Sequence, residues 1–272
     1  MAPGVVLGSQ SSSSRQTGFG FTMAGFTAGA DYRFQERFLV GLATGYGHTG
    51  AGFKGSGGGS VENHTWPLAA YAAYLPESFY AFGSLGYALN LFHVDRQIAV
   101  GTIARKPGGN TAGHQFNAYG EAGYDLKPGR LVLTPMATLA YSRLWINGFN
   151  EGGGGSLSLK VNPQQADSLQ TGVGAKLAAP LKGKGVALVP QIYATYQHEF
   201  ADNTRNLDAR LSQGGNTFTF RTDQRGHDFA VVGAGATFFG GKNFSLQVGY
   251  NAELGRAKYT AHTVNSALRY EF

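Results

Sequence analysis

Histidines are the residues of this chain best suited to catalysis, and there are seven of them. Three stand beside a residue with which they could act, in the pairs His227-Asp228, His198-Glu199 and His48-Thr49. Nucleophilic catalysis needs a base within hydrogen-bond reach of an activated hydroxyl, and a third group that orients the base. None of the pairs lies in a Gly-x-Ser-x-Gly elbow or beside a His-x-Ser pairing. The sequence therefore assigns no catalytic residue, and a hydrolase that uses His with Ser or Asp is only an alternative.

Metal and phosphate sites find no support in the spacing of residues along the chain. The absence of cysteine excludes thiolate ligands and a disulfide framework. We find no His-x-x-x-His spacing and no paired cluster of acidic residues with histidine, which would suggest zinc. The Gly-rich stretches 55–59 and 152–155 lack the Lys-Ser/Thr sequel of a phosphate cradle and are interpreted as outer loops. We therefore expect no metal and no cofactor.

Strands are the elements that must position any site in this chain. The last ten residues, 263–272, alternate between polar and apolar with a period of two. Successive side chains of a strand point to opposite faces. The apolar face of this strand would carry Val264, Leu268, Tyr270 and Phe272, and the polar face Asn265, Arg269 and Glu271. Since closing a sheet into a barrel removes the unpaired edge of a terminal strand, the ending predicts an outer-membrane barrel.

The same alternation continues towards the N-terminus. It predicts strands near residues 20–34, 38–49, 61–75, 79–95, 114–126, 131–147, 166–181, 186–200, 227–239, 243–254 and 258–272. Because bacterial single-chain barrels have an even number of strands, residues 4–8 are expected to supply a short or truncated strand at the front. The predicted fold is all-β, a transmembrane antiparallel up-and-down barrel of 12 strands. A soluble β-sandwich is the alternative, but its strands are usually only about 5 to 6 residues long.

Short turns and longer loops alternate between these strands. The short turns, at residues 35–37, 76–78, 127–129, 182–184 and 240–243, would lie on the periplasmic side. The longer Gly-rich connections, at 50–60, 99–113, 148–155 and 201–226, with a shorter one near Gly255, would be the outer loops. This arrangement puts both chain ends on the periplasmic side. It divides the chain into a truncated linker, first strand and Ser-rich loop over 1–19 and the barrel over 20–272.

Composition agrees with a barrel and argues against other classes. The chain has 42 Gly, 14 Tyr and 19 Phe in 272 residues, and only 14% of them are charged. No stretch approaches the roughly 18 to 20 apolar residues of a membrane-spanning helix, so a membrane protein must cross with strands. The net charge is +6, but Lys and Arg form no dense cluster, which argues against nucleic acid as a partner. Residues 1–8 lack the basic start and apolar core of a signal peptide, so we expect that Met1 is not the natural start.

A series of different short motifs extends over residues 26–272. They are Gly29-Ala30-Asp31-Tyr32 with Gly41 and Gly45-Tyr46; Arg96-Gln97-Ile98; Tyr119-Gly120-Glu121-Ala122-Gly123-Tyr124; Leu133-Thr134-Pro135 with Leu139-Ala140-Tyr141; Phe149-Asn150-Glu151-Gly152 with Leu157-Ser158-Leu159; Asp167-Ser168-Leu169 with Gly172 and Gly174; Pro190 with His198-Glu199-Phe200; and Leu268-Arg269-Tyr270-Glu271-Phe272. Each is weak alone, but their order and spacing are specific. On these motifs the chain resembles the C-terminal β-barrel translocator domain of a classical type V autotransporter.

The resemblance implies an integral protein of the outer membrane of a Gram-negative bacterium, in contact with phospholipid and lipopolysaccharide. It implies insertion by the barrel-assembly machinery, with periplasmic chaperones as further partners. An N-terminal passenger would reach the surface by type V secretion, through the lumen or through a hybrid of barrel and insertase. Leu268, Tyr270 and Phe272 fit the terminal signal that the machinery reads, or are simply the last lipid-facing strand. Family members carry a passenger and a pore helix before the first strand, whereas only about twenty residues precede Phe21 here.

Charged residues on the polar phase of the strands are expected to line the lumen, because a charge facing lipid at the midplane costs about 2 to 4 kcal/mol. The candidates are Arg96, Glu121, Asp125, Glu199, Glu253, Arg269 and Glu271. They would grip the passenger segment in the lumen, or only hydrate and stabilise the barrel. We expect a non-enzymatic translocator and anchor that is a monomer, since a closed barrel has no edge that demands a partner. A porin-like channel is the main alternative, ahead of a barrel hydrolase.

Overall fold

The computed structural model describes residues 1–272 except 14–15, 55–57, 184–185, 202–205, 223–225 and 242. Parts of the predicted turns at 182–184 and 240–243, of the predicted outer loops at 50–60 and 201–226, and of the Ser-rich loop within 1–19 therefore lie outside the described residues. Twelve long strands build the fold. They are β1 Ala2–Gln10, β2 Phe19–Phe34, β3 Phe38–Phe53, β4 Gly59–Tyr74, β5 Phe79–Arg96, β8 Gly108–Tyr124, β9 Val132–Ile146, β12 Gln164–Ala178, β14 Val186–Glu199, β17 Asp228–Gly240, β18 Phe244–Leu254 and β19 Tyr259–Tyr270.

These strands form one antiparallel sheet that closes on itself. Each long strand pairs with the long strands before and after it along the chain, and the two-residue strand β13 (Leu181–Lys182) pairs with β14 at a turn. Closure is completed by β1, where Val5 lies opposite Val264 of β19 and Ala24 of β2. The barrel therefore leaves none of the described long strands as an exposed edge, which removes the site of edge-to-edge aggregation.

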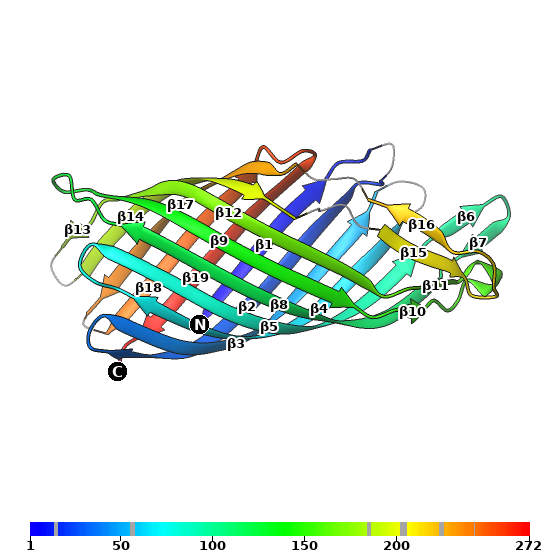
Figure 1. Cartoon of the computed structure of the whole chain (residues 1–272), viewed down its shortest axis with the longest axis horizontal. Coiled ribbons are helices and arrows are strands. Elements are labelled where there is room, and N and C mark those ends of the chain that lie inside the picture. The colour runs from blue at the N-terminus through cyan, green and yellow to red at the C-terminus, as the bar shows by residue number, and fades with distance from the viewer. Residues whose placement is uncertain (14–15, 55–57, 184–185, 202–205, 223–225, 242) are drawn as a thin grey trace.

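Both chain ends lie at one end of the barrel, with the short turns, and the long loops lie at the other (Figure 1). The Met1 amino group donates a hydrogen bond to the Leu268 carbonyl oxygen at 2.9 Å, four residues before the C-terminus. We call the end with the long loops the outer end. The predicted fold class is confirmed, including the short strand at the front.

Side chains alternate between the outside and the inside of the barrel wall. In β5 the outward Leu85, Tyr87 and Leu89 are exposed, while the inward Ala88 and Asn90 are buried. Large apolar side chains are exposed in the same way on every long strand, which is the surface that a lipid environment requires. The one helical element among the described residues is a 3₁₀ turn, η1 (Gly155–Leu157). No helix in the described part of the chain is long and apolar enough to cross a membrane.

Two segments expected as loops extend the barrel strands instead. β3 continues to Phe53 and β8 begins at Gly108, so the ladder reaches several residues into the stretches 50–60 and 99–113. Gly-rich sequence hides this extension, because a ladder is held by backbone N–H and C=O groups that glycine also carries. The barrel wall therefore rises above its apolar band at the outer end.

The remaining outer loops build two small sheets of their own. β6 (Ile98–Val100) and β7 (Ile103–Arg105) form a hairpin. β10 (Phe149–Asn150), β11 (Leu159–Val161), β15 (Asn206–Leu211) and β16 (Phe218–Arg221) form a four-stranded sheet in that order, which we call the outer sheet. Leu159, Val161 and Ala209 are its buried core. Figure 1 shows both sheets at the outer end, far from the chain ends.

Candidate functional site in the barrel lumen

A polar wall lines part of the barrel interior. The inward side chains of β8, β9, β12, β14, β17 and β18 surround a cavity of about 640 Å³. They are Tyr119, Glu121, Met136, Thr138, Ala140, Gln170, Lys176, Gln191, Tyr193, Thr195, Gln197, Phe229, Val231, Thr237, Gln247 and Glu253. Amides, hydroxyls and charges dominate this set, so the wall suits water and polar polypeptide rather than an apolar ligand.

Glu121 is held on this wall by two tyrosines. The Tyr80 hydroxyl donates a hydrogen bond to Oε1 at 2.7 Å, and the Tyr119 hydroxyl donates one to Oε2 at 2.5 Å. The Lys176 ammonium lies 5.2 Å from the centroid of the Tyr80 ring. An acidic and a basic group therefore face the lumen close together, with their orientation fixed by aromatic neighbours.

Glu199 ends β14 and is almost completely buried, with 2% of its side chain exposed. Its carboxylate accepts hydrogen bonds from the Ser168 hydroxyl (2.6 Å), the Gln170 amide (2.9 Å) and the backbone N–H of Leu169 (2.8 Å). The Arg256 guanidinium lies 3.4 Å away. Because a buried charge is tolerated only when it is paired and hydrogen-bonded, this network stabilises the outer part of the barrel.

Arg256 extends the network to the turn between β18 and β19. Its Nη1 donates to Glu253 at 3.2 Å and its Nε to the Gly226 carbonyl oxygen at 3.1 Å. The guanidinium carbon lies 4.5 Å from the centroid of the Phe229 ring. We call Glu199, Glu253 and Arg256 with their partners the Glu199 network. It ties β12, β14 and β17 to the β18–β19 turn on the lumen side.

Arg269 and Asp125 lie towards the end of the barrel that holds the chain ends. Arg269 makes a 2.7 Å ion pair with Asp31, which also accepts a 3.0 Å hydrogen bond from the Tyr71 hydroxyl. Glu271 lies 3.4 Å from Arg269 and is exposed. Asp125 accepts a 2.6 Å hydrogen bond from the buried Thr134 hydroxyl. The ion pair of Arg269 joins β19 to β2 across the end of the shorter strand β1.

Arg96 contacts the outer sheet rather than the polar wall. Its Nε and Nη2 donate parallel hydrogen bonds to the two carboxylate oxygens of Glu151, each at 2.6 Å. Glu151 is buried and also accepts a 2.9 Å hydrogen bond from the Leu159 backbone N–H. A two-pronged Arg–carboxylate pair fixes both position and orientation. Arg96 therefore fastens the end of β5 to the outer sheet, a contact that strand alternation did not reveal.

Charged residues on the outward face of the long strands gather at the outer end. Glu62, Asp95, Arg143, Asp167 and Asp228 all lie near the outer ends of their strands. Arg143 and Asp167 face each other across β9 and β12, with 3.5 Å between their charged atoms. Water and lipid headgroups can solvate charges there, which agrees with the high cost of a charge at the midplane.

The terminal strand presents its apolar face to the outside. Leu268 and Tyr270 are about half exposed and Phe272 is fully exposed. The rings of Tyr270 and Phe272 lie 5.2 Å apart and nearly perpendicular. The three side chains therefore form one continuous outward stripe at the end of the barrel where the chain finishes.

His198 of one histidine pair lies beside Asp228 of another. His198 Nδ1 lies 2.7 Å from the Asp228 carboxylate, which also accepts a hydrogen bond from the Tyr196 hydroxyl. Within the described residues, no serine or threonine hydroxyl hydrogen-bonds to His198 or His48. His198, Asp228 and Tyr196 therefore form one hydrogen-bonded group.

Sequence reasoning missed several groups that the barrel brings together. Asp31 and Lys176 lie at inward positions of their strands. Continuing the two-residue alternation through the Gly- and Ala-rich residues around them would have identified both as inward. Arg256 lies in a turn and Glu151 in a loop, where alternation gives no signal. His48, Glu62 and His64 meet across two strands, which no spacing along one strand reveals.

Comparison with known proteins gives a consistent family. A family model described as the autotransporter beta-domain matches residues 5–251. The Esterase EstA of Pseudomonas aeruginosa is 28% identical over 274 residues, which cover 97% of this chain and 40% of the esterase. The chain thus spans about 40% of the length of that relative.

Solved structures of low identity share the fold. The translocator domain of the autotransporter NalP from Neisseria meningitidis superposes with a TM-score of 0.76 at 18% identity, covering 100% of this chain and 86% of that chain. The beta domain of the Bordetella autotransporter BrkA gives a TM-score of 0.63 at 19% identity, with coverages of 100% and 98%.

We can now state where this protein resides and which family it belongs to, from the family match, the closed barrel and its apolar outer surface. The chain is an integral β-barrel of the bacterial outer membrane with the fold of a translocator domain. It belongs to the autotransporter beta-domain family.

Proposed function

We propose that this barrel exports a polypeptide joined to its N-terminus to the cell surface by type V secretion and then anchors it in the outer membrane. The observation that carries the proposal is the position of Met1, at the end of the barrel opposite the outer sheet. A polypeptide joined to Met1 starts at that end and reaches the outer end through the polar lumen. The barrel supplies a path and an anchor, and we propose that it has no chemistry of its own.

The lumen offers two unlike surfaces to such a polypeptide. The polar wall carries Glu121, Lys176 and Glu253, which can pair with charges on a passing or resident segment. In β3 the inward Gly47 leaves space beside the backbone of the barrel, whereas the Tyr71 ring fills the space beside Gly41. A chain segment can therefore lie close to β3 while its charged side chains face the polar wall.

Assembly partners follow from the same proposal. We propose that the barrel-assembly machinery reads the outward stripe of Leu268, Tyr270 and Phe272 while the last strand is still unpaired. Periplasmic chaperones would hold the unfolded chain before that step, and phospholipid and lipopolysaccharide would cover the apolar surface afterwards. We propose that the assembled barrel is a monomer, in which residues 1–19 supply the first strand and the loop after it and residues 20–272 supply the rest of the barrel.

Cysteine trapping tests whether the upstream polypeptide lies in the lumen. The chain contains no cysteine, so each introduced thiol is unique. A reporter with one cysteine in a helical linker would be fused ahead of Met1, and the barrel would carry either Gln247→Cys, which faces the cavity, or Val248→Cys, which faces outward. We expect a disulfide between linker and barrel with the cysteine at 247 and none at 248. Equal cross-linking at both positions, or at neither when the linker cysteine is moved along its length, would contradict passage through the lumen.

A further inference from the structure

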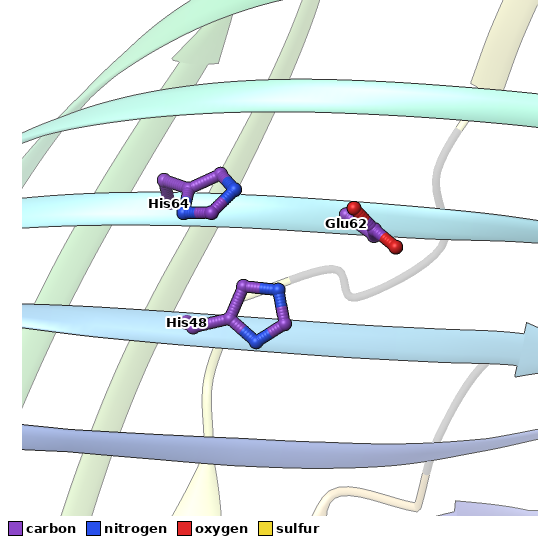
Figure 2. A group of neighbouring side chains, drawn as sticks. All are labelled: His48, Glu62 and His64. Carbon is purple, nitrogen blue, oxygen red and sulfur yellow. The ribbon is translucent and has the colours of Figure 1, made fainter.

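Three potential metal ligands meet on the outside of the barrel, across two neighbouring strands. In the register of β3 and β4, His48 lies directly opposite His64. Glu62 precedes His64 by two residues in β4, so its side chain points to the same face. A nitrogen of each histidine and a carboxylate oxygen all lie within 4.8 Å of one another (Figure 2). Within the described residues, this is the one cluster of three or more such side chains.

We propose that His48, Glu62 and His64 bind one divalent transition-metal ion of the zinc type. Two imidazoles with one carboxylate are a ligand set that Zn²⁺ accepts, and imidazole selects it over the hard cations Ca²⁺ and Mg²⁺, which prefer oxygen ligands. Three protein ligands leave a fourth tetrahedral position for water. The site lies outside the lumen and goes beyond the export function proposed above.

Side-chain rotation is enough to bring the ligands onto an ion. Zn²⁺ lies about 2.0 to 2.2 Å from nitrogen and oxygen ligands, which places the ligand atoms of a tetrahedron roughly 3.4 Å apart. The present separations of up to 4.8 Å close by small changes in the rotatable bonds of these side chains. The backbone already holds the two strands in register through the ladder of β3 and β4, so the ion finds its ligands largely positioned.

Tyr46 orients one of the ligands. Its hydroxyl oxygen lies 2.6 Å from His64 Nδ1. In the tautomer in which Nδ1 carries the proton, this N–H donates to Tyr46 and leaves the Nε2 lone pair for the metal. Metal-binding histidines generally use the second ring nitrogen in this way, and loss of such a partner typically weakens metal binding about 10- to 100-fold.

The cluster lies near the outer end of the barrel wall, where an ion can be hydrated. The aromatic rings of Tyr46 and Trp66, 5.6 Å apart, flank it on the side nearer the apolar band. Such rings favour the interface between membrane and water. Both histidines are partly exposed and Glu62 is exposed, so solvent reaches the open position. A bound ion would join β3 to β4 at this level and stabilise the folded barrel by mass action.

Two other Tyr–His pairs of the barrel provide a matched control. The Tyr87 hydroxyl contacts His114 Nδ1 at 2.5 Å, and Tyr250 contacts His262 Nδ1 at 2.8 Å. In each pair the two side chains are outward and diagonal across neighbouring strands, as in Tyr46 and His64. Neither belongs to a three-ligand cluster among the described residues. A Tyr–His pair alone therefore should not bind the metal.

Zinc titration of the purified, folded barrel tests the proposal. The barrel would be prepared without a polyhistidine tag, freed of metal with a chelator, and titrated with Zn²⁺ in detergent micelles by calorimetry. We expect one Zn²⁺ per chain, a rise in the temperature of heat-induced unfolding, and visible absorption of tetrahedral Co²⁺ when cobalt replaces zinc. His48→Gln and Glu62→Gln should each weaken binding by about tenfold or more, and Tyr46→Phe by a similar factor.

His114→Gln is the control and should bind zinc as the unchanged barrel does. The proposal is overturned if the unchanged barrel binds no more Zn²⁺ than His48→Gln does, or if His114→Gln weakens binding as much. Folding of every variant would be checked by its heat-modifiable migration in gels. If His48→Gln does not fold, the Zn²⁺ affinity of Glu62→Gln becomes the test, because Glu62 is exposed and its substitution by Gln keeps the size of the side chain.

Discussion

Replacing both Tyr270 and Phe272 with serine is expected to abolish assembly of the barrel in the outer membrane while leaving synthesis of the chain unchanged. Both rings point outward and lie in contact at the end of the last strand. Each ring contributes about 1.5 to 3 kcal/mol of transfer free energy when it leaves water for lipid. The variant loses both rings at the position where the last strand must be recognised. The measurement is the fraction of heat-modifiable barrel in isolated outer membranes, compared with total chain in the cell.

A second outward pair of aromatic rings, at a similar separation, serves as the control. Phe34 and Phe38 are outward, partly exposed and stacked with 5.3 Å between ring centroids, at the same end of the barrel but away from the C-terminus. Replacing this pair with serine removes comparable apolar surface and should still allow assembly. Normal assembly of the Tyr270/Phe272 variant would refute the role of the terminal stripe. If both variants failed to assemble to the same extent, the terminal stripe would act only as lipid-facing surface and not as an assembly signal.

The second large effect is expected at Glu199. Substitution by alanine removes the acceptor of four hydrogen bonds, from Ser168, Gln170 and the backbone N–H groups of Leu169 and Ala201. It also takes one carboxylate away from the buried Arg256. Removing one partner of a buried ion pair typically costs about 3 to 5 kcal/mol, because the groups left behind stay desolvated. The Glu199→Ala barrel should therefore unfold at clearly lower urea concentration in detergent micelles.

Glu271→Ala controls for the loss of a negative charge. Glu271 is exposed, and 3.4 Å separates its carboxylate from the Arg269 guanidinium. Because water and salt screen such a surface ion pair, it contributes little to the free energy of unfolding. We expect the unfolding midpoint of this variant to stay close to that of the unchanged barrel. An equal midpoint for Glu199→Ala and Glu271→Ala would show that the Glu199 network does not hold the barrel together.

Alternation along the strands predicted the barrel because each strand has one lipid face and one lumen face. The prediction of β18 from residues 243–254 and of β5 from 79–95 depends on that contrast alone. The alternation of apolar and polar residues weakens where both faces of a strand contact water. The outer ends of β3 and β8, and the short strands β10, β15 and β16, were therefore expected as loops, although their backbones pair.

Side-chain partners were less predictable than faces, for a physical reason. Alternation tells on which side of the wall a residue lies, but its neighbours are set by the register between strands. Glu121 was expected to be inward, yet its contact with Tyr80 depends on the pairing of β5 with β8. The cluster of His48, Glu62 and His64 likewise needs the register of β3 and β4, so a search for spacing within one strand could not find it.

Surface display on intact cells decides whether this barrel exports a polypeptide joined to its N-terminus. A signal peptide, an epitope-tagged soluble segment and a helical linker would be fused ahead of Met1, and intact cells would be treated with protease. We expect that the epitope is lost while the barrel stays protected, and that the Tyr270/Phe272 serine variant displays no epitope. A barrel that assembles normally while the epitope stays shielded in intact cells, and becomes cleavable only after the outer membrane is opened, would contradict export and favour a porin-like channel.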